Sequence, residues 1–418
     1  MIHRTALLLI VSLFAALSCG AALANDPFTL NEYAIGLMEK GEHDKALEQL
    51  QKAYSMYPYD AVLKKNLAEA YTFVGQRRMK ENNYEAAAAS FDLARELFPD
   101  TPRYYVFRGI ALYYAKFPDA AQNELERARS MGGDSPEILY YLARIQYDAG
   151  NLGQAQEFLE KTLALKADFP AAVELAAKVR REVEVEKSMD KGYSSRFVIS
   201  YDVSSRSPIA GEILSVLEDA YSTVGRDLSL FPAMRIPVIL YTRKDFRTVT
   251  AGPDWSGGLY DGKIRLPVGG AEQLSDQLKG VLYHEYTHVV VQELTHGNCP
   301  TWLNEGLAEL QGRKIFNQPL GELGKAVKQS QYIPFSRLEK GFTDLATREA
   351  ALAYQQSYSL VNFMVTSYGW PKVSEILISL GAGMNIADAV KKSLGDFGLD
   401  YEGMLAEWRS YMQREFGG

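Results

Sequence analysis

The stretch VLYHEYTHVVVQEL (Val281–Leu294) holds two of the five histidines in a chain of 418 residues. Residues four apart share one face of an α-helix, so His284 and His288 can direct two imidazole nitrogens at one ion. Glu285 lies about 100° further round the helix, where its carboxylate can reach a metal-bound water without being a ligand. Hydrolysis with Zn²⁺ needs this arrangement of two imidazoles and a proton-accepting carboxylate. The alternative is a solvated helix face with two histidines.

A second motif, PTWLNEGLAEL (Pro300–Leu310), follows the first. HExxH followed by WLNEGLAE resembles the gluzincin group of zinc metallopeptidases, which have the thermolysin-like Peptidase MA fold. The resemblance implies that Glu305 is the third zinc ligand, on a helix packed against the histidine helix. Glu309, one turn later, is expected to hold a histidine tautomer. The resemblance therefore implies an α+β thermolysin-like (zincin) metallopeptidase domain at 196–415.

Two other side chains near these motifs are candidate ligands. His296 lies eight residues beyond His288, but across a Gly-Asn-Cys-Pro turn signal that contains Cys299. The metzincin pattern, with a glycine and a third histidine at fixed spacing, is not matched. We therefore expect both to be loop residues near the mouth of the site. The loop between His288 and Glu305 is slightly shorter than in the zinc aminopeptidases, which affects substrate preference more than the metal site.

A zinc peptidase also needs a donor that stabilises the oxyanion of the tetrahedral intermediate. In ALAYQQSYSLVNFM (Ala351–Met364), the YxxSxxL spacing resembles the YxxGxxV element that carries the catalytic tyrosine of the aminopeptidases. The resemblance points to Tyr354, with Tyr358 as the second candidate. The chain has 26 tyrosines, so packing in the core is the alternative for either residue.

The segment GGLYDGKIRLPV (Gly257–Val268) is predicted to form a β-hairpin, with Asp261-Gly262 as a two-residue turn. In the thermolysin-like fold an edge strand ahead of the zinc helix pairs with an extended peptide, and the resemblance assigns this place to KIRLPV (Lys263–Val268). The GxMEN element that binds a free amino terminus in the aminopeptidases is missing from the sequence. An endopeptidase is therefore expected.

The amino-terminal half is a repeat array. An alanine recurs with spacings of 41, 34 and 34 residues, at Ala46, Ala87, Ala121 and Ala155. Four positions after each alanine stands a large apolar residue: Leu50, Phe91, Leu125 and Leu159. A second column of small residues comprises Ala34, Gly75, Gly109 and Ala143. Small residues where two helices cross and a large apolar residue one turn later resemble tetratricopeptide (TPR) repeats. The resemblance implies an α-solenoid of four repeats with a capping helix from Pro170, in a domain at 27–190.

A TPR groove often binds peptides or protein partners. Exposed members of three tyrosine pairs are candidates to line it: Tyr104-Tyr105, Tyr113-Tyr114 and Tyr140-Tyr141. The alternative is that these rings pack helix against helix. After the capping helix we expect a linker at about 190–195, and β-rich runs begin at Arg196.

The first 24 residues have the pattern of an export signal, with a basic start, an apolar run (Ala6–Leu17) and small residues at Ala22–Ala24. The apolar run is too short to span a bilayer comfortably. Two processing routes compete: cleavage after Ala24 would release a soluble protein, whereas ALSCG resembles a lipobox in which Cys19 would carry a lipid anchor. Both routes place the protein in the periplasm or cell envelope.

The net charge of −7 and the lack of a long Lys/Arg run argue against a nucleic-acid partner. Two hypotheses of function remain. The first is an exported, zinc-dependent peptidase whose TPR array recruits a protein substrate or partner. The second is a non-catalytic TPR adaptor of the cell envelope, in which the peptidase-like domain is a binding module.

Overall fold

The structure is a computed structural model of the chain, and it describes residues 26–202, 209–250, 258–268, 271, 273–342 and 345–416. The predicted export signal, including Cys19, lies outside these residues. No helix in the described part of the chain is long and apolar enough to cross a membrane. The chain divides into two compact units: Met1–Ile145 with Phe158–Phe169, and Gln146–Glu157 with Pro170–Gly418.

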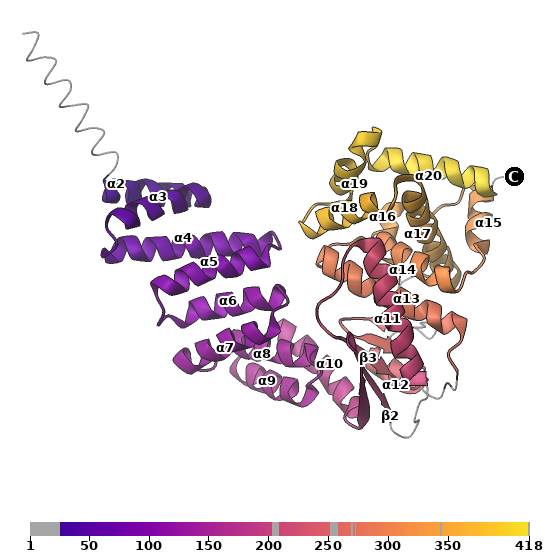
Figure 1. Cartoon of the computed structure of the whole chain (residues 1–418), viewed down its shortest axis with the longest axis horizontal. Coiled ribbons are helices and arrows are strands. Elements are labelled where there is room, and N and C mark those ends of the chain that lie inside the picture. Colours follow the sequence, from indigo (N-terminus) through magenta and orange to yellow (C-terminus); the bar gives the residue numbers. More distant parts are fainter. Residues whose placement is uncertain are drawn as a thin grey trace, which may run out of the picture. The chain divides into compact units, whose positions relative to one another are not determined.

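The first unit is a stack of helices (Figure 1), and each helix between Pro27 and Gly132 packs against the next. Its helices are α2 (Pro27–Glu39), α3 (His43–Met56), α4 (Ala61–Lys80), α5 (Tyr84–Leu97), α6 (Pro102–Tyr114) and α7 (Pro118–Gly132), with parts of α8 (Pro136–Asp148) and α9 (Leu152–Leu165). A Cβ on Gly75 would lie 2.6 Å from the Phe91 ring, and one on Gly109 would lie 2.9 Å from Leu125. Small residues are therefore needed where the sequence columns place them.

The tyrosine pairs of this unit contribute mainly to helix packing. Four of their six members are buried: Tyr104, Tyr105, Tyr113 and Tyr140. The remaining two, Tyr114 and Tyr141, are partly buried and their hydroxyl oxygens lie 3.3 Å apart. The packing interpretation accounts for these rings better than an exposed groove lining does.

The second unit contains a five-stranded mixed sheet of order β1-β2-β3-β5-β4. The strands are β1 (Met189–Tyr193), β2 (Phe197–Asp202), β3 (Ile236–Leu240), β4 (Leu259–Tyr260) and β5 (Ile264–Leu266). The pairs β2–β3 and β3–β5 are parallel, whereas β1–β2 and β4–β5 are antiparallel. A TPR-like solenoid followed by a domain with a small mixed sheet confirms the predicted fold class.

Three local expectations about this sheet are wrong. The segment expected to be a linker forms β1, because residues 189–193 pair with β2 along their whole length. The strand expected at the edge, β5, is an inner strand, since β3 pairs with one side of it and β4 with the other. The hairpin turn has three residues, 261–263, because Tyr260 pairs with Ile264, and Gly262 has a φ of 100°. The two-residue β4 is therefore the edge strand next to the site.

Helices cover both faces of the sheet. On one face α11 (Ile209–Leu228) and α13 (Asp276–Thr295) share a core with alternate strand residues such as Val238, Ile264 and Leu266. On the other face α10 (Pro170–Glu186) and α12 (Arg243–Thr250) pack against Ile239 and Tyr241. The remaining helices are α14 (Thr301–Ile315), α15 (Gly321–Gln329), α16 (Phe335–Leu338), α17 (Thr347–Tyr368), α18 (Trp370–Gly381), α19 (Ile386–Leu394) and α20 (Tyr401–Phe416). Because α10 packs on this sheet, it belongs by contacts to the second unit, and the domain boundaries drawn from the sequence stay predictions.

Candidate metal centre

Helix α13 is central to the second unit. The Ser275 side chain caps its amino terminus by accepting a hydrogen bond from the Leu278 amide. Leu282, Val290 and Val291 have at most 1% of their surface exposed, although they point in different directions round the helix. A helix that is apolar on most sides is a core helix. The polar residues of HEYTH therefore lie in an otherwise apolar interior.

Glycines bring the neighbouring helices close to α13. A Cβ on Gly312 of α14 would lie 2.9 Å from the carbonyl oxygen of Gly280 on α13. Gly306 of α14 approaches α17 in the same way, because a Cβ there would lie 2.5 Å from the Ser357 carbonyl oxygen. The glycine of the NEG element is thus required by packing. These crossings hold Glu305 of α14 opposite the histidines of α13.

The three predicted ligands converge. Ligand atoms of His284, His288 and Glu305, hereafter the ligand cluster, all lie within 4.8 Å of one another. Glu305 Oε2 lies 3.4 Å from His284 Nε2 and 3.7 Å from His288 Nε2. This oxygen is buried and has no hydrogen-bond partner among the described residues. Two imidazole nitrogens and a carboxylate oxygen are the donor set of a catalytic zinc site. A divalent cation would satisfy the otherwise orphaned Oε2, so the residues fit Zn²⁺.

The other imidazole nitrogens are held from outside the cluster. His288 Nδ1 lies 3.0 Å from Asn304 Oδ1, which sets the tautomer that leaves Nε2 free to bind a metal. His284 Nδ1 lies 3.5 Å from Glu309 Oε1. Glu309 in turn accepts a hydrogen bond from Arg313 Nε at 2.8 Å. Glu309 lies where the resemblance placed it, whereas Asn304 and Arg313 were missed. The position of Asn304, directly before the predicted ligand, was the available signal.

The charges of the cluster shift the pKa values of its members. Burial would lower the pKa of His284, but the carboxylates of Glu305 and Glu309 outweigh burial and raise it. Burial would raise the pKa of Glu305, but His288 and His284 outweigh it and lower that pKa. The carboxylate of Glu305 is therefore held in its charged form, which is the form that binds a cation.

Glu285 is buried beside the ligand cluster, with 5% of its surface exposed. Burial is the main cause that raises the pKa of its carboxyl. Glu285 Oε2 has no hydrogen-bond partner in the described part of the chain. Gly258, just ahead of β4, lies against this side chain, and a Cβ there would come within 2.6 Å of Glu285 Oε1. A buried carboxylate with an open oxygen can accept a proton.

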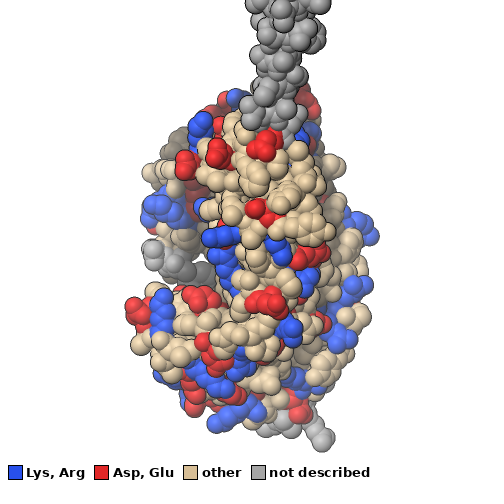
Figure 2. Space-filling model, turned by 90° about the vertical axis from the view of Figure 1, so that its left-hand side faces the viewer, with Lys and Arg blue, Asp and Glu red and all other residues tan. Residues whose placement is uncertain are grey.

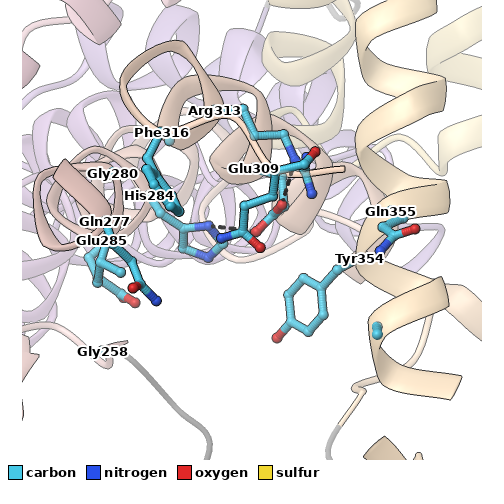
Figure 3. Close-up of a pocket in the computed structure, with 14 residues that line it drawn as sticks. Gly258, Gln277, Gly280, His284, Glu285, Glu309, Arg313, Phe316, Tyr354 and Gln355 are labelled. Carbon is cyan, nitrogen blue, oxygen red and sulfur yellow. Dashed lines mark hydrogen bonds and ion pairs between the residues drawn. The ribbon is translucent and has the colours of Figure 1, made fainter. Parts of the chain in front are cut away.

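A cavity of about 360 Å³ opens in front of these residues. His284, Glu285 and Glu309 line it from α13 and α14, and Tyr354 lines it from α17 (Figure 3). In this view the Tyr354 ring points into the cavity from the side opposite His284. Tyr358 instead lies under the Arg313 guanidinium, with its ring centre 4.6 Å away, and is not among the lining residues. Of the two candidate tyrosines, Tyr354 is the one that faces the cavity.

Comparison with known families agrees with this geometry. Residues 233–414 match the model of the Peptidase MA superfamily, and residues 112–179 match that of the tetratricopeptide repeat. The chain joins TPR repeats to a Peptidase MA superfamily domain. The search of the curated proteins found no match.

Three of the solved structures that the chain resembles are TPR proteins. One is TTC0263, a thermophilic TPR protein of Thermus thermophilus, at 23% identity and a TM-score of 0.27, which covers 42% of this chain and 98% of that chain. The first TPR of Spaghetti (RPAP3) bound to an HSP90 peptide has 24% identity and a TM-score of 0.24, over 30% of this chain and 95% of that chain. The TPR domain of P58(IPK) has 11% identity and a TM-score of 0.26, over 85% of this chain and 87% of that chain.

The two other candidate ligands of the Peptidase MA domain lie outside the ligand cluster. His296 is exposed at the carboxyl end of α13, with a φ of 51°. Cys299 precedes α14, and burial raises the pKa of its thiol. Neither contributes to the one group of potential ligands found among the described residues.

On the face drawn in Figure 2, acidic and basic side chains are interspersed and form no extended field of one sign.

Proposed function

We propose that the Peptidase MA domain is a zinc-dependent endopeptidase and that the TPR array recruits its protein substrate or a protein partner. The observation that carries the proposal is the buried, unpartnered Glu305 Oε2 between two imidazole Nε2 atoms, with the open carboxylate of Glu285 beside them. In each of these two carboxylates, Oε2 has no hydrogen-bond donor among the described residues, whereas a purely structural site would supply one. The family match at 233–414 supports the same interpretation.

In this proposal the residues have distinct roles. His284, His288 and Glu305 hold Zn²⁺, which supplies Lewis-acid polarisation and lowers the pKa of a water molecule. Glu285 accepts the proton of the attacking water at its carboxylate and passes that proton to the leaving amine. Tyr354 donates a hydrogen bond to the developing oxyanion, a role supported by its place in the cavity lining. The edge strand β4 is the strand on which an extended substrate would pair.

The decisive test compares the wild type with Glu285→Gln. We expect both proteins to bind close to one zinc per chain by elemental analysis, because Glu285 is not a ligand. Cleavage of a peptide library by the variant should fall about 10²- to 10⁴-fold, since the general base is lost. If the variant cut as fast as the wild type, the mechanism would be wrong. A wild-type chain that binds no zinc would favour the non-catalytic adaptor.

The role of Tyr354 has its own test. Tyr354→Phe should lower kcat about 100-fold with unchanged zinc content, because it removes only an oxyanion donor. Tyr358→Phe is the matched control, since this ring packs on Arg313 outside the cavity lining. Equal kcat values in the two variants would remove Tyr354 from the mechanism.

Recruitment by the first unit and export of the chain belong to the same proposal. The TPR match at 112–179 supports recruitment, and exposed rings such as Tyr59 and Phe117 offer apolar contacts. Export to the periplasm or cell envelope is supported by the signal pattern alone. Mass spectrometry of the mature chain separates the two processing routes, because one begins at Asn25 and the other at a lipid-modified Cys19.

A further inference from the structure

A second buried cluster of charged side chains lies on the face of the sheet that α10 covers. Its centre consists of Glu182 and Glu186 from α10 and of Lys263 and Arg265 from the β4–β5 hairpin, with side chains at most 9% exposed. Lys263 Nζ lies 2.7 Å from Glu182 Oε2. Arg265 Nη2 donates to Glu182 Oε1 at 2.6 Å, and Nη1 donates to Glu186 Oε1 at 3.2 Å. Both cations of the hairpin are thus bound to one helix.

All three guanidinium nitrogens of Arg265 donate hydrogen bonds. Its Nε donates to Asp261 Oδ1 at 2.9 Å. Besides its carboxylate on α10, each terminal nitrogen donates to a tyrosine hydroxyl, Nη2 to Tyr147 at 3.1 Å and Nη1 to Tyr241. A planar guanidinium that donates hydrogen bonds to five acceptors can take only one position and orientation. Arg265 therefore fixes the strand that carries it relative to α10.

The cluster is also electrically balanced. Lys178 of α10 lies 2.8 Å from Asp261 Oδ2, at the turn of the hairpin. Burial would raise the pKa of Asp261, but Arg265 and Lys178 outweigh burial and hold that pKa below its usual value. Three acidic and three basic residues, hereafter the hairpin–α10 network, make up the cluster: Glu182, Glu186, Asp261, Lys178, Lys263 and Arg265.

A buried, balanced ion network adds little net stability compared with well-packed apolar residues, because desolvation of the charges offsets their attraction. The network instead fixes how the hairpin is oriented on α10, since each hydrogen bond limits an angle as well as a distance. Apolar residues at 263 and 265 would let the hairpin slide on α10. The position of the hairpin is therefore the property that the network controls.

The same hairpin reaches the site. β4 pairs with β5 in antiparallel register, with Leu259 opposite Arg265. Gly258, the residue before β4, lies against the Glu285 side chain. Strand β4 has only two residues and, among the described strands, no neighbour on its outer side. Its position beside Glu285 therefore depends on β5, and that of β5 depends partly on the hairpin–α10 network.

We propose that Arg265, supported by Glu182 and Lys178, is a positioning residue that holds the edge strand β4 where an extended substrate can pair with it. This inference rests on the proposed peptidase function. An edge strand that pairs with the peptide backbone contributes equally to the ground state and the transition state, so its displacement raises KM and leaves kcat nearly unchanged. A residue needed only for folding would not raise KM while leaving kcat unchanged.

The experiment compares the full chain with its Arg265→Met and Lys178→Met variants. Lys178 is partly exposed and contributes one ion pair to the turn, so its variant should fold even if Arg265→Met does not. Arg348→Met is the matched control, because this arginine is exposed and pairs with Glu322 at 2.7 Å. The measurements are zinc content, hydrogen exchange over residues 258–266, and KM and kcat for a peptide cleaved by the wild type.

In Arg265→Met we expect exchange over 258–266 to be about tenfold faster, through local opening of the hairpin. KM should rise at least about fivefold, with kcat within about twofold of the wild type and zinc retained. Lys178→Met should also raise the exchange rate and KM, but by less, and Arg348→Met should change neither. Wild-type exchange and KM in a folded Arg265→Met protein would overturn the proposal, and so would a loss confined to kcat or to zinc. If Arg265→Met does not fold, Lys178→Met decides by the same criteria.

The two proposals fail in different ways. A wild type that binds zinc but cleaves no peptide would remove the peptidase function, whereas the exchange measurement would still decide whether Arg265 positions β4.

Discussion

The second unit has two buried clusters of charged residues on opposite faces of one sheet, and they differ in how their polar atoms are satisfied. In the ligand cluster and its surroundings, Glu285 Oε2 and Glu305 Oε2 have no hydrogen-bond partner among the described residues. In the hairpin–α10 network both oxygens of Glu182 and all three nitrogens of Arg265 are bonded. Open buried acceptors mark a place for a cation or a substrate, whereas closed networks mark structure.

The balance of charge separates the two clusters as well. Around the histidines lie three carboxylates, Glu285, Glu305 and Glu309, and Arg313 is bonded to only one of them. A divalent cation would make up this deficit of positive charge. The hairpin–α10 network already has three charges of each sign. Only the first cluster therefore needs something that the chain does not supply.

The largest expected effect comes from the same substitution made in both clusters. Glu182→Gln should lower the free energy of unfolding by about 3 kcal/mol, because it leaves buried Lys263 and Arg265 without their shared carboxylate. Glu305→Gln should cost the metal-free protein less, since Oε2 has no hydrogen bond to lose and gives up only its attraction to the imidazoles of His284 and His288, 3.4 and 3.7 Å away. Chemical denaturation of the two metal-free variants measures both values.

With zinc present, the order of stability of these two variants should be reversed, so that Glu182→Gln has the higher free energy of unfolding. At a thousandfold excess over Kd, zinc should stabilise the wild type and Glu182→Gln by about 4 kcal/mol and Glu305→Gln hardly at all. Calcium, which prefers more oxygen ligands, is the control ion. The two clusters would not differ in how their polar atoms are satisfied if both substitutions lowered the unfolding free energy of the metal-free protein equally. Stabilisation of Glu305→Gln by zinc would lead to the same conclusion.

The clusters also differ in how far the sequence could predict them. His284, Glu285, His288, Glu305 and Glu309 lie within 26 residues on two adjacent helices, so helical spacing and motif resemblance were sufficient. Lys263 and Arg265 alternate with apolar residues, which is the pattern of a solvent-facing side of a strand. Their burial depends on Glu182 and Glu186, about eighty residues away, and no local pattern reports such a pairing.

The same reasoning explains the errors in the sheet. The residues of β1, MDKGY, have no alternation of apolar and polar residues, so only pairing with β2 makes them a strand. The inner place of β5 follows from its parallel pairing with β3, a contact that the hairpin motif does not contain. The repeat columns, by contrast, describe contacts between neighbouring helices, such as Gly75 with Phe91, and local spacing was enough to predict them.

A smaller effect is expected from the support of His288. Asn304→Ala removes the acceptor 3.0 Å from His288 Nδ1, so the ring no longer has a fixed tautomer and orientation. Zinc affinity should fall about 10- to 100-fold, as is usual for the hydrogen-bond partner of a ligand. Competition with a chelator measures the affinity. Asn298→Ala is the control, because that side chain bonds to the backbone of Leu380 instead. An unchanged affinity would mean that packing alone orients His288.

The smallest expected effect isolates the general base. A Cβ on Gly258 would lie 2.6 Å from Glu285 Oε1 and 2.8 Å from its Cγ, so Gly258→Ala must push the carboxylate away. Movement of the free end of a side chain costs little stability, but it alters the path of the proton. We expect kcat to fall about tenfold, with zinc content and unfolding free energy close to the wild type. Gly262→Ala is the contrasting variant in the same hairpin: its Cβ meets no atom within 4 Å, but its φ of 100° makes any side chain strained, so it should lose stability and retain kcat. If Gly258→Ala left kcat unchanged, a side chain at residue 258 would not disturb proton transfer by Glu285, and the contrast between the two clusters would apply to the metal ligands alone.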